Sequence, residues 1–187
     1  MILSSAKRDN IWYATVTDKN GGLVACSFSN NRKSAEESTI RSLPNSLRRN
    51  LTRSSRESEA IQVLHRIYTA GRDANGHPSI ALAVSSSFLR RVYKTTMRIP
   101  KGKVITYGKL AKLAGSKCAP RAVGNAMARN PLPLVVPCHR VVLSTLQIGN
   151  YGSERNGRSQ TKRELLEREG VQFEGLKISQ SCVWNPS

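Results

Sequence analysis

A cysteine and a histidine are adjacent in the segment NPLPLVVPCHRVV, which spans residues 130–142. Pro137 and the apolar run before it restrict the position of Cys138. The thiolate is the reactive form of cysteine, and a nearby imidazole or cation lowers the pKa of a thiol. Neighbouring side chains on a strand point to opposite faces, so we expect His139 to reach the thiol through a water molecule. Because buried cysteines are common, this pair alone is a weak sign of catalysis.

Two short helices are predicted just before this segment, over residues 107–114 and 120–129. Gly115 ends the first helix, and the Asn-Pro pair at 130–131 ends the second. Pro120 suits the first turn of a helix. Two helices joined by a turn of about four residues are typical of a helix-turn-helix.

The second of these helices has few side chains suited to reading base edges in a major groove. Arg121 is its single long cation near the start, and Ala122, Gly124 and Ala126 keep its surface small. This composition favours a close, sequence-independent approach to a nucleic-acid groove. Close packing against another helix is the alternative interpretation.

The charge of the chain is strongly positive, with 30 Lys and Arg against 12 Asp and Glu. Residues 1–87 carry 12 basic and 7 acidic residues, whereas residues 88–187 carry 18 and 5. Between Asp73 and Glu154 there are 12 basic residues and no acidic one. Such a stretch indicates a polyanionic partner, most simply nucleic acid. Composition does not separate DNA from RNA, from an acidic membrane surface, or from a merely basic soluble protein.

The composition also sets the broad class, since 39% hydrophobic and 22% charged residues are typical of a soluble globular protein. No run of about 18 apolar residues predicts a membrane-spanning helix. The start of the chain lacks the pattern of a secretory signal. We therefore expect a cytoplasmic protein, or a nuclear one if the source is eukaryotic.

Metal binding is not expected, because no Cys-x-x-Cys pair and no zinc-like histidine spacing occurs. The cysteines are Cys26, Cys118, Cys138 and Cys182, and the histidines are His65, His77 and His139. Intracellular thiols usually stay reduced, although pairing among Cys26, Cys118 and Cys182 stays open.

Other elements follow from local patterns. Residues 11–17 and 22–28 are β-prone runs around a turn signal and predict a hairpin. Residues 57–72 place apolar side chains at helical spacing. Residues 80–84 are predicted to be a strand or the edge of a linker, and a domain boundary is placed near 75–87.

Two further helices are expected in the second half of the chain. Ser86 or Ser87 is a suitable cap for a helix that Pro100 ends. Thr161 to Glu164 is a capping box for a late helix, which Gly170 closes.

With its flanks, the cysteine segment resembles the active site of the O6-alkylguanine-DNA alkyltransferases, also called methylated-DNA–protein-cysteine methyltransferases. The motifs that carry the resemblance follow the order of that family. Residues 99–111 resemble the entry to its helix-turn-helix, and residues 121–127 resemble its recognition helix. Then follow Asn130-Pro-x-Pro133, the signature Pro137-Cys-His-Arg-Val141, the active-site loop Gly149-Asn-Tyr-Gly152, and the closing helix at 165–170. The resemblance is clear over residues 88–176.

The resemblance implies roles for individual residues. Cys138 would accept the alkyl group by in-line displacement, and Glu169 would orient His139, which takes the thiol proton through water. Tyr107 would donate a hydrogen bond to the leaving guanine. Asn130 would brace the turn before the cysteine.

A second set of residues would bind DNA and the flipped base. Flipping is required because an O6 substituent inside a duplex is out of reach of a buried thiol, and Arg121 would fill the gap in the stack. The DNA-binding residues would be Arg121, Ala122, Gly124 and Ala126, and the substrate-binding residues Met127, Pro133, Val141, Tyr151, Gly152 and Lys162. The amide of Gly152 would serve O6, while the carbonyls of Cys138 and Val141 would accept from the exocyclic amine.

The link between Tyr151 and Lys162 is longer than is usual in the family. This enlarged polar loop over residues 152–161 leads us to expect an altered tolerance for bulky alkyl groups.

The resemblance also implies the architecture. We expect an α/β protein with an RNase H-like domain over 1–85, built on a small antiparallel sheet with helices. A mostly helical domain over 86–187 would carry the helix-turn-helix and the active-site loop.

The implied activity is DNA repair by irreversible transfer of an alkyl group from O6-alkylguanine, and from O4-alkylthymine, to one cysteine per protein molecule. The expected partner is double-stranded DNA containing the alkylated base. The protein would act as a monomer without a cofactor, metal or membrane.

Three other functions compete with this interpretation. A non-catalytic damage binder is disfavoured because such relatives lack the cysteine. A helix-turn-helix transcription regulator needs base-reading side chains, which are scarce on 120–129. A cysteine hydrolase needs a distant histidine, and neither His65 nor His77 is in a recognisable setting.

Overall fold

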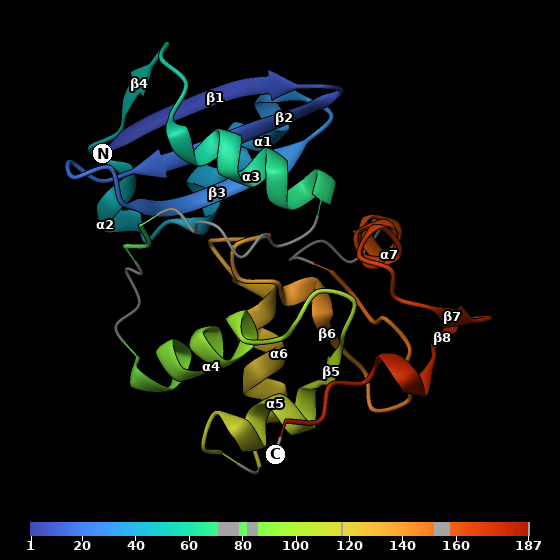
Figure 1. Cartoon of the computed structure of the whole chain (residues 1–187). Helices are drawn as coiled ribbons and strands as arrows, with labels where there is room; N and C mark the ends of the chain where they lie inside the picture. The colour runs from blue at the N-terminus through green and yellow to red at the C-terminus, as the bar shows by residue number, and fades with distance from the viewer. Residues whose placement is uncertain (71–78, 82–85, 117, 152–157, 187) are drawn as a thin grey trace. The chain divides into compact units, whose positions relative to one another are not determined.

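The computed structural model describes residues 1–70, 79–81, 86–116, 118–151 and 158–186, the side chains of 158–160 excepted. The chain divides into two compact units (Figure 1). The first consists of Met1–Ala83 with Pro131–Val135, and the second of Val84–Asn130 with Val136–Ser187. Part of the cysteine segment, just before Cys138, therefore belongs to the first unit. No helix in the described ranges is long and apolar enough to cross a bilayer.

The first unit is built on a four-stranded sheet in the order β3-β2-β1-β4. Its strands are β1 (Ile2–Arg8), β2 (Ile11–Thr17), β3 (Leu23–Ser29) and β4 (Thr52–Ser54). The first three form an antiparallel meander, whereas β4 pairs parallel to β1. The expectation of a purely antiparallel sheet is therefore wrong. Between β3 and β4 the chain forms two helices, and this long connection lets it return in the direction of β1.

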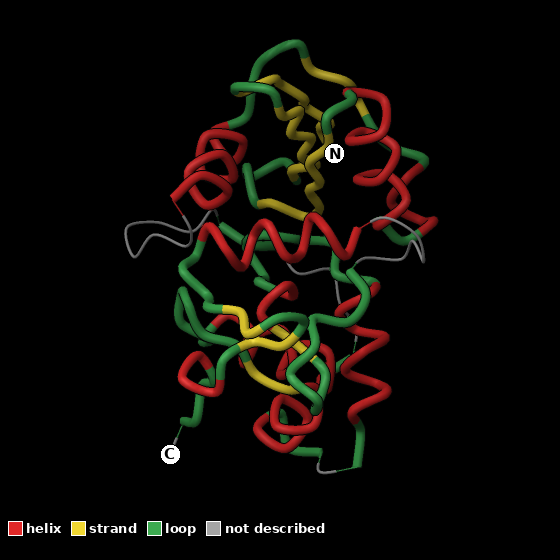
Figure 2. The backbone as a smooth tube through the Cα atoms, turned by 90° about the vertical axis from the view of Figure 1, so that its right-hand side faces the viewer, coloured by secondary structure: helices red, strands yellow, loops and turns green. Residues whose placement is uncertain are grey.

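Helices cover both faces of this sheet, as Figure 2 shows. They are α1 (Arg32–Ser42), α2 (Asn45–Arg48) and α3 (Glu59–Ala70). Ile40 of α1 packs against a buried cluster that includes Val16 of β2. On the opposite face, Tyr13 of β2 meets Tyr68 of α3 edge to face. The apolar residues predicted at helical spacing in α3 are all buried: Ile61, Leu64, Ile67 and Tyr68.

The second unit carries most of the expected helices. They are α4 (Ser87–Met97), α5 (Tyr107–Leu113), α6 (Pro120–Ala128) and α7 (Arg158–Arg168), with short 3-10 helices η1 (Cys138–Arg140) and η2 (Gln180–Cys182). Its strands are β5 (Ile105–Thr106), β6 (Val141–Val142), β7 (Phe173–Glu174) and β8 (Lys177–Ile178). A core of Val104, Val142, Leu166, Val171, Ile178 and Cys182 joins β6, α7, β8 and η2.

Two local expectations in this unit are confirmed and one is wrong. The hydroxyl of Ser86 caps α4 by accepting a hydrogen bond from the amide of Leu89. Gly170 has a φ of +85° directly after α7. However, α7 begins at Arg158, so Thr161 lies inside the helix and is not its cap. With Thr161 as its cap the helix would begin at residue 162, so the prediction began it four residues too late.

Candidate active site

Pairing of two short strands brings the start of α5 to the cysteine segment. β5 runs parallel to β6, with Ile105 opposite Val141 and Thr106 opposite Val142. The hydroxyl of Thr106 caps α5 at the amide of Lys109. Tyr107 thus begins its helix beside the strand that follows the cysteine.

Cys138 begins a 3-10 helix and is not part of a strand, which corrects the expectation from the sequence. Pro137 has φ −76° and ψ 65°, and the amide of Cys138 donates to the carbonyl of Val136 at 2.7 Å. This hydrogen bond between residues 136 and 138 closes a three-residue turn, which changes the chain direction and ends the extended backbone before Cys138. The side chains of Cys138 and His139 are consequently both buried, with residue exposures of 6% and 1%.

Asn130 holds the cysteine from the preceding turn. Its Nδ2 donates to the carbonyl of Val136 at 2.9 Å and to Sγ of Cys138 at 3.2 Å. Burial raises the pKa of the Cys138 thiol. The hydrogen bond from Asn130, the charge of Lys162 and a hydrogen bond with Tyr151 each act in the opposite direction. The site therefore keeps a neutral thiol at rest and provides groups that favour its ionised form.

His139 and Glu169 form a buried pair. Nε2 of His139 lies 2.9 Å from Oε1 of Glu169. Burial would raise the pKa of Glu169, but hydrogen bonds and charges of His139 and Arg140 outweigh it and lower the pKa to about 2. An ionised carboxylate only accepts hydrogen bonds, so we assign the imidazole proton to Nε2. Nδ1 is then an acceptor, and it is buried without a hydrogen-bond partner among the described residues.

Arg140 completes this network from the other side of the carboxylate. Its Nε and Nη2 donate to the two oxygens of Glu169 at 2.8 and 2.6 Å, and Nη1 donates to the carbonyl of Ile99 at 2.7 Å. The guanidinium is fully buried. Burial lowers the pKa of His139, and the charge of Arg140 lowers it further, while Glu169 opposes this. The network therefore favours a neutral imidazole that can act as a base.

The end of α7 positions the carboxylate. Amides of Gly170 and Val171 donate to carbonyls of Glu167 and Leu166 at 2.9 and 3.0 Å, which closes the helix. Gly102 packs against this end with a φ of +73°, and a Cβ there would lie 3.1 Å from the carbonyl oxygen of Glu169. The positive φ and the close approach both require glycine.

Lys162 is a second buried cation. Its Nζ donates to the carbonyls of Val141 and Ile148 at 2.7 and 2.5 Å, which ties the cysteine segment to the loop before Tyr151. The same Nζ lies 6.0 Å from the ring centroid of Tyr107. Burial lowers the pKa of Lys162 to about 8 despite the opposing charge of Cys138. Burial, and then that same charge, raises the pKa of Tyr107 to about 12, so its phenol stays a hydrogen-bond donor.

The structure separates the residues predicted to bind DNA. Arg121 and Ala122 are exposed at the start of α6. Gly124 is partly exposed, and a Cβ there would meet nothing within 4 Å. Helix packing therefore does not explain this glycine, whereas an approaching partner would. Ala126 is buried, and its carbonyl accepts from the hydroxyl of Tyr93 at 3.1 Å, so its side chain does not share the exposed face.

The residues predicted to line the substrate pocket are also divided. Met127, Val141, Tyr151 and Lys162 are buried in the second unit. Pro133 belongs to the first unit, where its carbonyl accepts from Sγ of Cys26 at 3.4 Å. Gly152 and most of the long loop 152–161 lie outside the described residues. The carbonyl of Val141 already accepts a hydrogen bond from Lys162, and the carbonyl of Cys138 accepts one from the amide of Val141. Each carbonyl retains a second lone pair.

Arg140 carries the carboxylate network. Its place in the motif predicts a structural role, in which it pairs with a carboxylate or with backbone carbonyls, and it contacts both Glu169 and the carbonyl of Ile99. One residue of this region escaped the sequence analysis. Tyr93 has its pKa raised to about 12 by burial and by the charge of Cys138. In the sequence it is only one of the apolar residues of a helix face, and nothing there signals its electrostatic link to the cysteine. All four cysteines are free thiols, which answers the open question of pairing.

The structure thus places a buried thiol next in the chain to an imidazole–carboxylate pair, on an α/β scaffold that carries a basic helix pair. The family model for the "6-O-methylguanine DNA methyltransferase, DNA binding domain" matches residues 87–171. A methylated-DNA–protein-cysteine methyltransferase of Archaeoglobus fulgidus is 44% identical over 121 residues, which are 63% of this chain and 78% of that relative. The chain belongs to the methylated-DNA–protein-cysteine methyltransferase family.

The structural comparison covers nearly the whole chain. The crystal structure of the O6-methylguanine-DNA methyltransferase of Pyrococcus kodakaraensis strain KOD1 matches with a TM-score of 0.71 and 30% identity, over 91% of this chain and 99% of that one. The α/β fold is therefore that of this family. A curated relative from Thermococcus sibiricus is 43% identical over 118 residues, 62% of this chain. The matched region spans 63% of that relative and about half of three further archaeal relatives.

Proposed function

We propose that this protein repairs DNA by transferring an alkyl group from O6-alkylguanine to Cys138. The observation that carries the proposal is the buried Sγ of Cys138, held by Asn130, next to a His139–Glu169 pair whose Nδ1 has no partner among the described residues. Such a nitrogen is suited to receive a proton from the thiol through one water molecule. Membership in the family supports the choice of reaction.

The proton transfer prepares the nucleophile. The thiol of Cys138 loses its proton through water to Nδ1 of His139, and the ionised Glu169 stabilises the imidazolium that forms. Arg140 keeps Glu169 ionised, so the carboxylate orients the imidazole and does not itself take the proton. Asn130 and the positive charge of Lys162 stabilise the thiolate.

The alkyl transfer is an in-line displacement at carbon. Sγ of Cys138 forms a bond to the alkyl carbon while the bond from that carbon to O6 breaks, and the electron pair passes to the guanine. The phenol of Tyr107 donates a hydrogen bond to the base as this charge develops. The products are S-alkylcysteine and a guanine anion. The anion becomes unmodified guanine by taking up one proton from water, and the imidazolium of His139 returns one proton to water. Because a thioether is not hydrolysed, each protein molecule reacts once.

Duplex DNA is the proposed partner of α5 and α6, which form the helix-turn-helix. Exposed Arg121 and Ala122 and the open space at Gly124 support a close approach of α6 to a groove. Arg121 takes the place of the flipped base. We assign Met127, Val141, Tyr151 and Lys162 to the pocket, and Pro133 and Gly152 on the family resemblance alone.

The proposal includes four further points: O4-alkylthymine as a second substrate, action as a monomer, a cytoplasmic or nuclear location, and domains over 1–85 and 86–187. Within it, the first domain is RNase H-like. These points come from the family resemblance and the sequence.

The test is the intact-protein mass after incubation with duplex DNA carrying one O6-methylguanine, with Cys138→Ser as the control. We expect a gain of one methyl group on the peptide that holds Cys138, and no gain in the control. Lesion binding without a mass gain would instead identify a damage binder. Absence of both would leave a basic helix-turn-helix protein, such as a regulator.

A further inference from the structure

The net charge of the first 87 residues is concentrated in one short stretch. Five arginines lie between Glu37 and Glu57, with no lysine and no acidic residue among them: Arg41, Arg48, Arg49, Arg53 and Arg56. The other residues of 1–87 carry seven basic and seven acidic side chains, since the totals are 12 and 7. The net charge of +5 over residues 1–87 therefore equals the charge of these five arginines, which we call the arginine patch.

The five arginines come from consecutive elements of the first unit. Arg41 lies in the last turn of α1, Arg48 ends α2 and Arg49 follows it, Arg53 lies on the edge strand β4, and Arg56 follows in the next turn. Figure 1 shows α2 and β4 at the same end of the sheet, on the left of the view. All five arginines are exposed.

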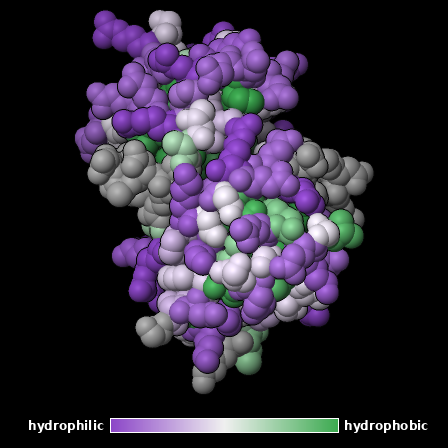
Figure 3. Space-filling model, turned by 45° about the vertical axis from the view of Figure 1, so that its right-hand side comes forward, coloured by the Kyte–Doolittle hydropathy of each residue, from purple (hydrophilic) through white to green (hydrophobic). Residues whose placement is uncertain are grey.

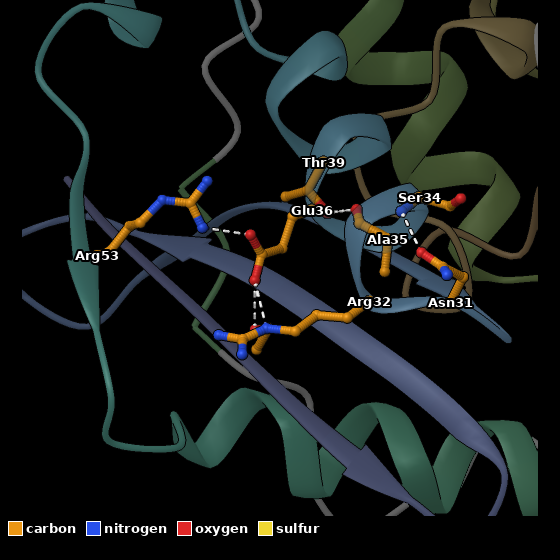
Figure 4. A network of polar contacts seen from close by, with 8 residues as sticks. Asn31, Arg32, Ser34, Ala35, Glu36, Thr39 and Arg53 are labelled. Atoms are coloured by element: carbon orange, nitrogen blue, oxygen red, sulfur yellow. Dashed lines mark hydrogen bonds and ion pairs between the residues drawn. The ribbon is translucent and has the colours of Figure 1, made fainter.

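Internal contacts explain only two of the five arginines. Nε and Nη2 of Arg48 donate to the carbonyls of Leu43 and Arg41 at 2.9 and 2.6 Å. Arg53 contacts the carboxylate of Glu36, which Arg32 also reaches, as Figure 4 shows. Burial would raise the pKa of Glu36, but Ser5 and the two arginines lower it to about 2, so this carboxylate stays ionised and fixed.

The other three side chains have no structural task in the fold. Arg41, Arg49 and Arg56 make no side-chain hydrogen bond or ion pair with the described residues. A solvated surface normally mixes both signs of charge, because like charges repel one another. Three exposed guanidinium groups of the patch have no ion-pair partner among the described residues. They therefore indicate an anionic partner.

The chemistry of the patch selects phosphate groups of a nucleic-acid backbone. A guanidinium binds phosphate through two parallel hydrogen bonds, which ammonium groups cannot do. Seven hydroxyl or amide side chains are interspersed: Ser42, Asn45, Ser46, Asn50, Thr52, Ser54 and Ser55. Such side chains are frequent phosphate contacts. No aromatic residue occurs over 38–56 to stack on bases, and Figure 3 shows a largely hydrophilic surface on the first unit.

We infer that the arginine patch is a second phosphate-binding surface, which holds the backbone of duplex DNA independently of sequence and of the alkylated base. The inference rests on the proposed function only for the choice of DNA as the nucleic acid. It assigns to the first unit a part in holding DNA, separate from the helix pair of the second unit.

The test compares two variants with the same loss of charge. Arg49→Gln/Arg56→Gln changes two patch arginines whose side chains make no hydrogen bond or ion pair with the described residues. The matched control, Lys19→Gln/Arg66→Gln, removes two exposed cations of the same unit outside the patch. Binding to an undamaged duplex of about 30 base pairs is measured by fluorescence anisotropy from about 50 to 300 mM salt, where each phosphate contact contributes about 0.9 to the salt slope.

We expect the slope of log K against log salt to decrease by about two in the patch variant and by less than about 0.5 in the control. Equal changes in both variants, or no change in either, would overturn the inference. A third outcome would also overturn the inference. If the slope is unchanged and only the patch variant binds a poly-glutamate peptide more weakly, the partner is an acidic protein.

A second readout separates this inference from the proposed function. The alkyl-transfer rate from a small benzylated guanine base, which needs no duplex, is measured for both variants and should equal that of the wild type. If the wild type transfers no alkyl group but the slope decreases as expected, the proposed function fails and the phosphate-binding surface stands.

Discussion

Replacing Glu169 by glutamine tests the buried charge network most directly. The change removes the only carboxylate that contacts Arg140 and His139 among the described residues. Arg140 then remains buried without a counter-charge, and breaking a buried ion pair in this way costs about 3 to 5 kcal/mol. We expect the free energy of unfolding of Glu169→Gln to be lower by that amount at pH 7.

The difference should shrink in acid, and its sign follows from the pKa of Glu169. That pKa is lowered from 4.5 to about 2 in the fold. Ionised Glu169 therefore contributes stability that is complete above pH 4.5 and is lost as the pH falls toward 2. Linkage gives a loss in the wild type of about 1 kcal/mol at pH 4 and about 2 kcal/mol at pH 3. The variant lacks this term, so the two proteins converge.

The assay is urea unfolding at pH 7, 5, 4 and 3, followed by tryptophan fluorescence. A Trp12→Phe background leaves Trp184 as the only tryptophan, so the signal reports on the second unit. A second pair, His139→Gln with and without Glu169→Gln, removes the imidazole from the comparison. A difference in unfolding free energy that stays constant from pH 7 to pH 3 in both pairs would refute the role assigned to the carboxylate.

Four other outcomes are expected. S-methylation of Cys138 adds a methyl group to a buried site, and overpacking there costs about 1–3 kcal/mol. It should therefore lower the Tm by roughly 2 to 12 °C in calorimetry, and an unchanged Tm contradicts this. Asn130→Ala removes a hydrogen bond to the thiolate, worth about 1.5–3 kcal/mol, so the single-turnover transfer rate should decrease about 10- to 150-fold and its pH profile shift upward. In the wild type we expect the transfer rate to decrease above pH 8, where Lys162 loses its proton. Lys162→Met should slow transfer and remove this decrease, and a decrease that remains in the variant points to another group. Gly102→Ala should lower the free energy of unfolding by about 1–3 kcal/mol in urea unfolding, because Gly102 has a positive φ. Gly124→Ala serves as its control, because the space at Gly124 is open.

The sequence predicted those elements whose signals are local. The hairpin of β2 and β3, the buried face of α3, and the bounds of α5 and α6 follow from turn residues and apolar spacing. β1 was missed because its residues alternate only weakly between apolar and polar. Asp9, with a φ of 50° in the turn before β2, was a usable signal, since Asp tolerates this conformation in tight hairpins.

The chemistry of the site was predictable only as far as the motif extends. Cys138 and His139 are adjacent in the chain, but their buried positions depend on the turn at Pro137. Glu169 lies thirty residues further on, and the bidentate contact that lowers its pKa comes from Arg140. Tertiary contacts of this kind leave no spacing pattern in a single sequence. The membership of Pro131–Val135 in the first unit is equally invisible in the local pattern.

The charges of the second unit predict that alkylation of Cys138 would disturb more than packing. The region holds two buried cations, Arg140 and Lys162, and one buried carboxylate, Glu169, so its positive charge is in excess until Cys138 ionises. The charge on Cys138 raises the pKa of Lys162, against the larger effect of burial. A thioether cannot ionise, so after the reaction this opposing effect is absent, and burial continues to lower the pKa of Lys162. A neutral amine donates weaker hydrogen bonds, and the contacts of Lys162 with Val141 and Ile148 weaken accordingly. Compared with the thiolate state, we therefore expect the alkylated site to hold the cysteine segment less tightly to the loop that leads to Tyr151.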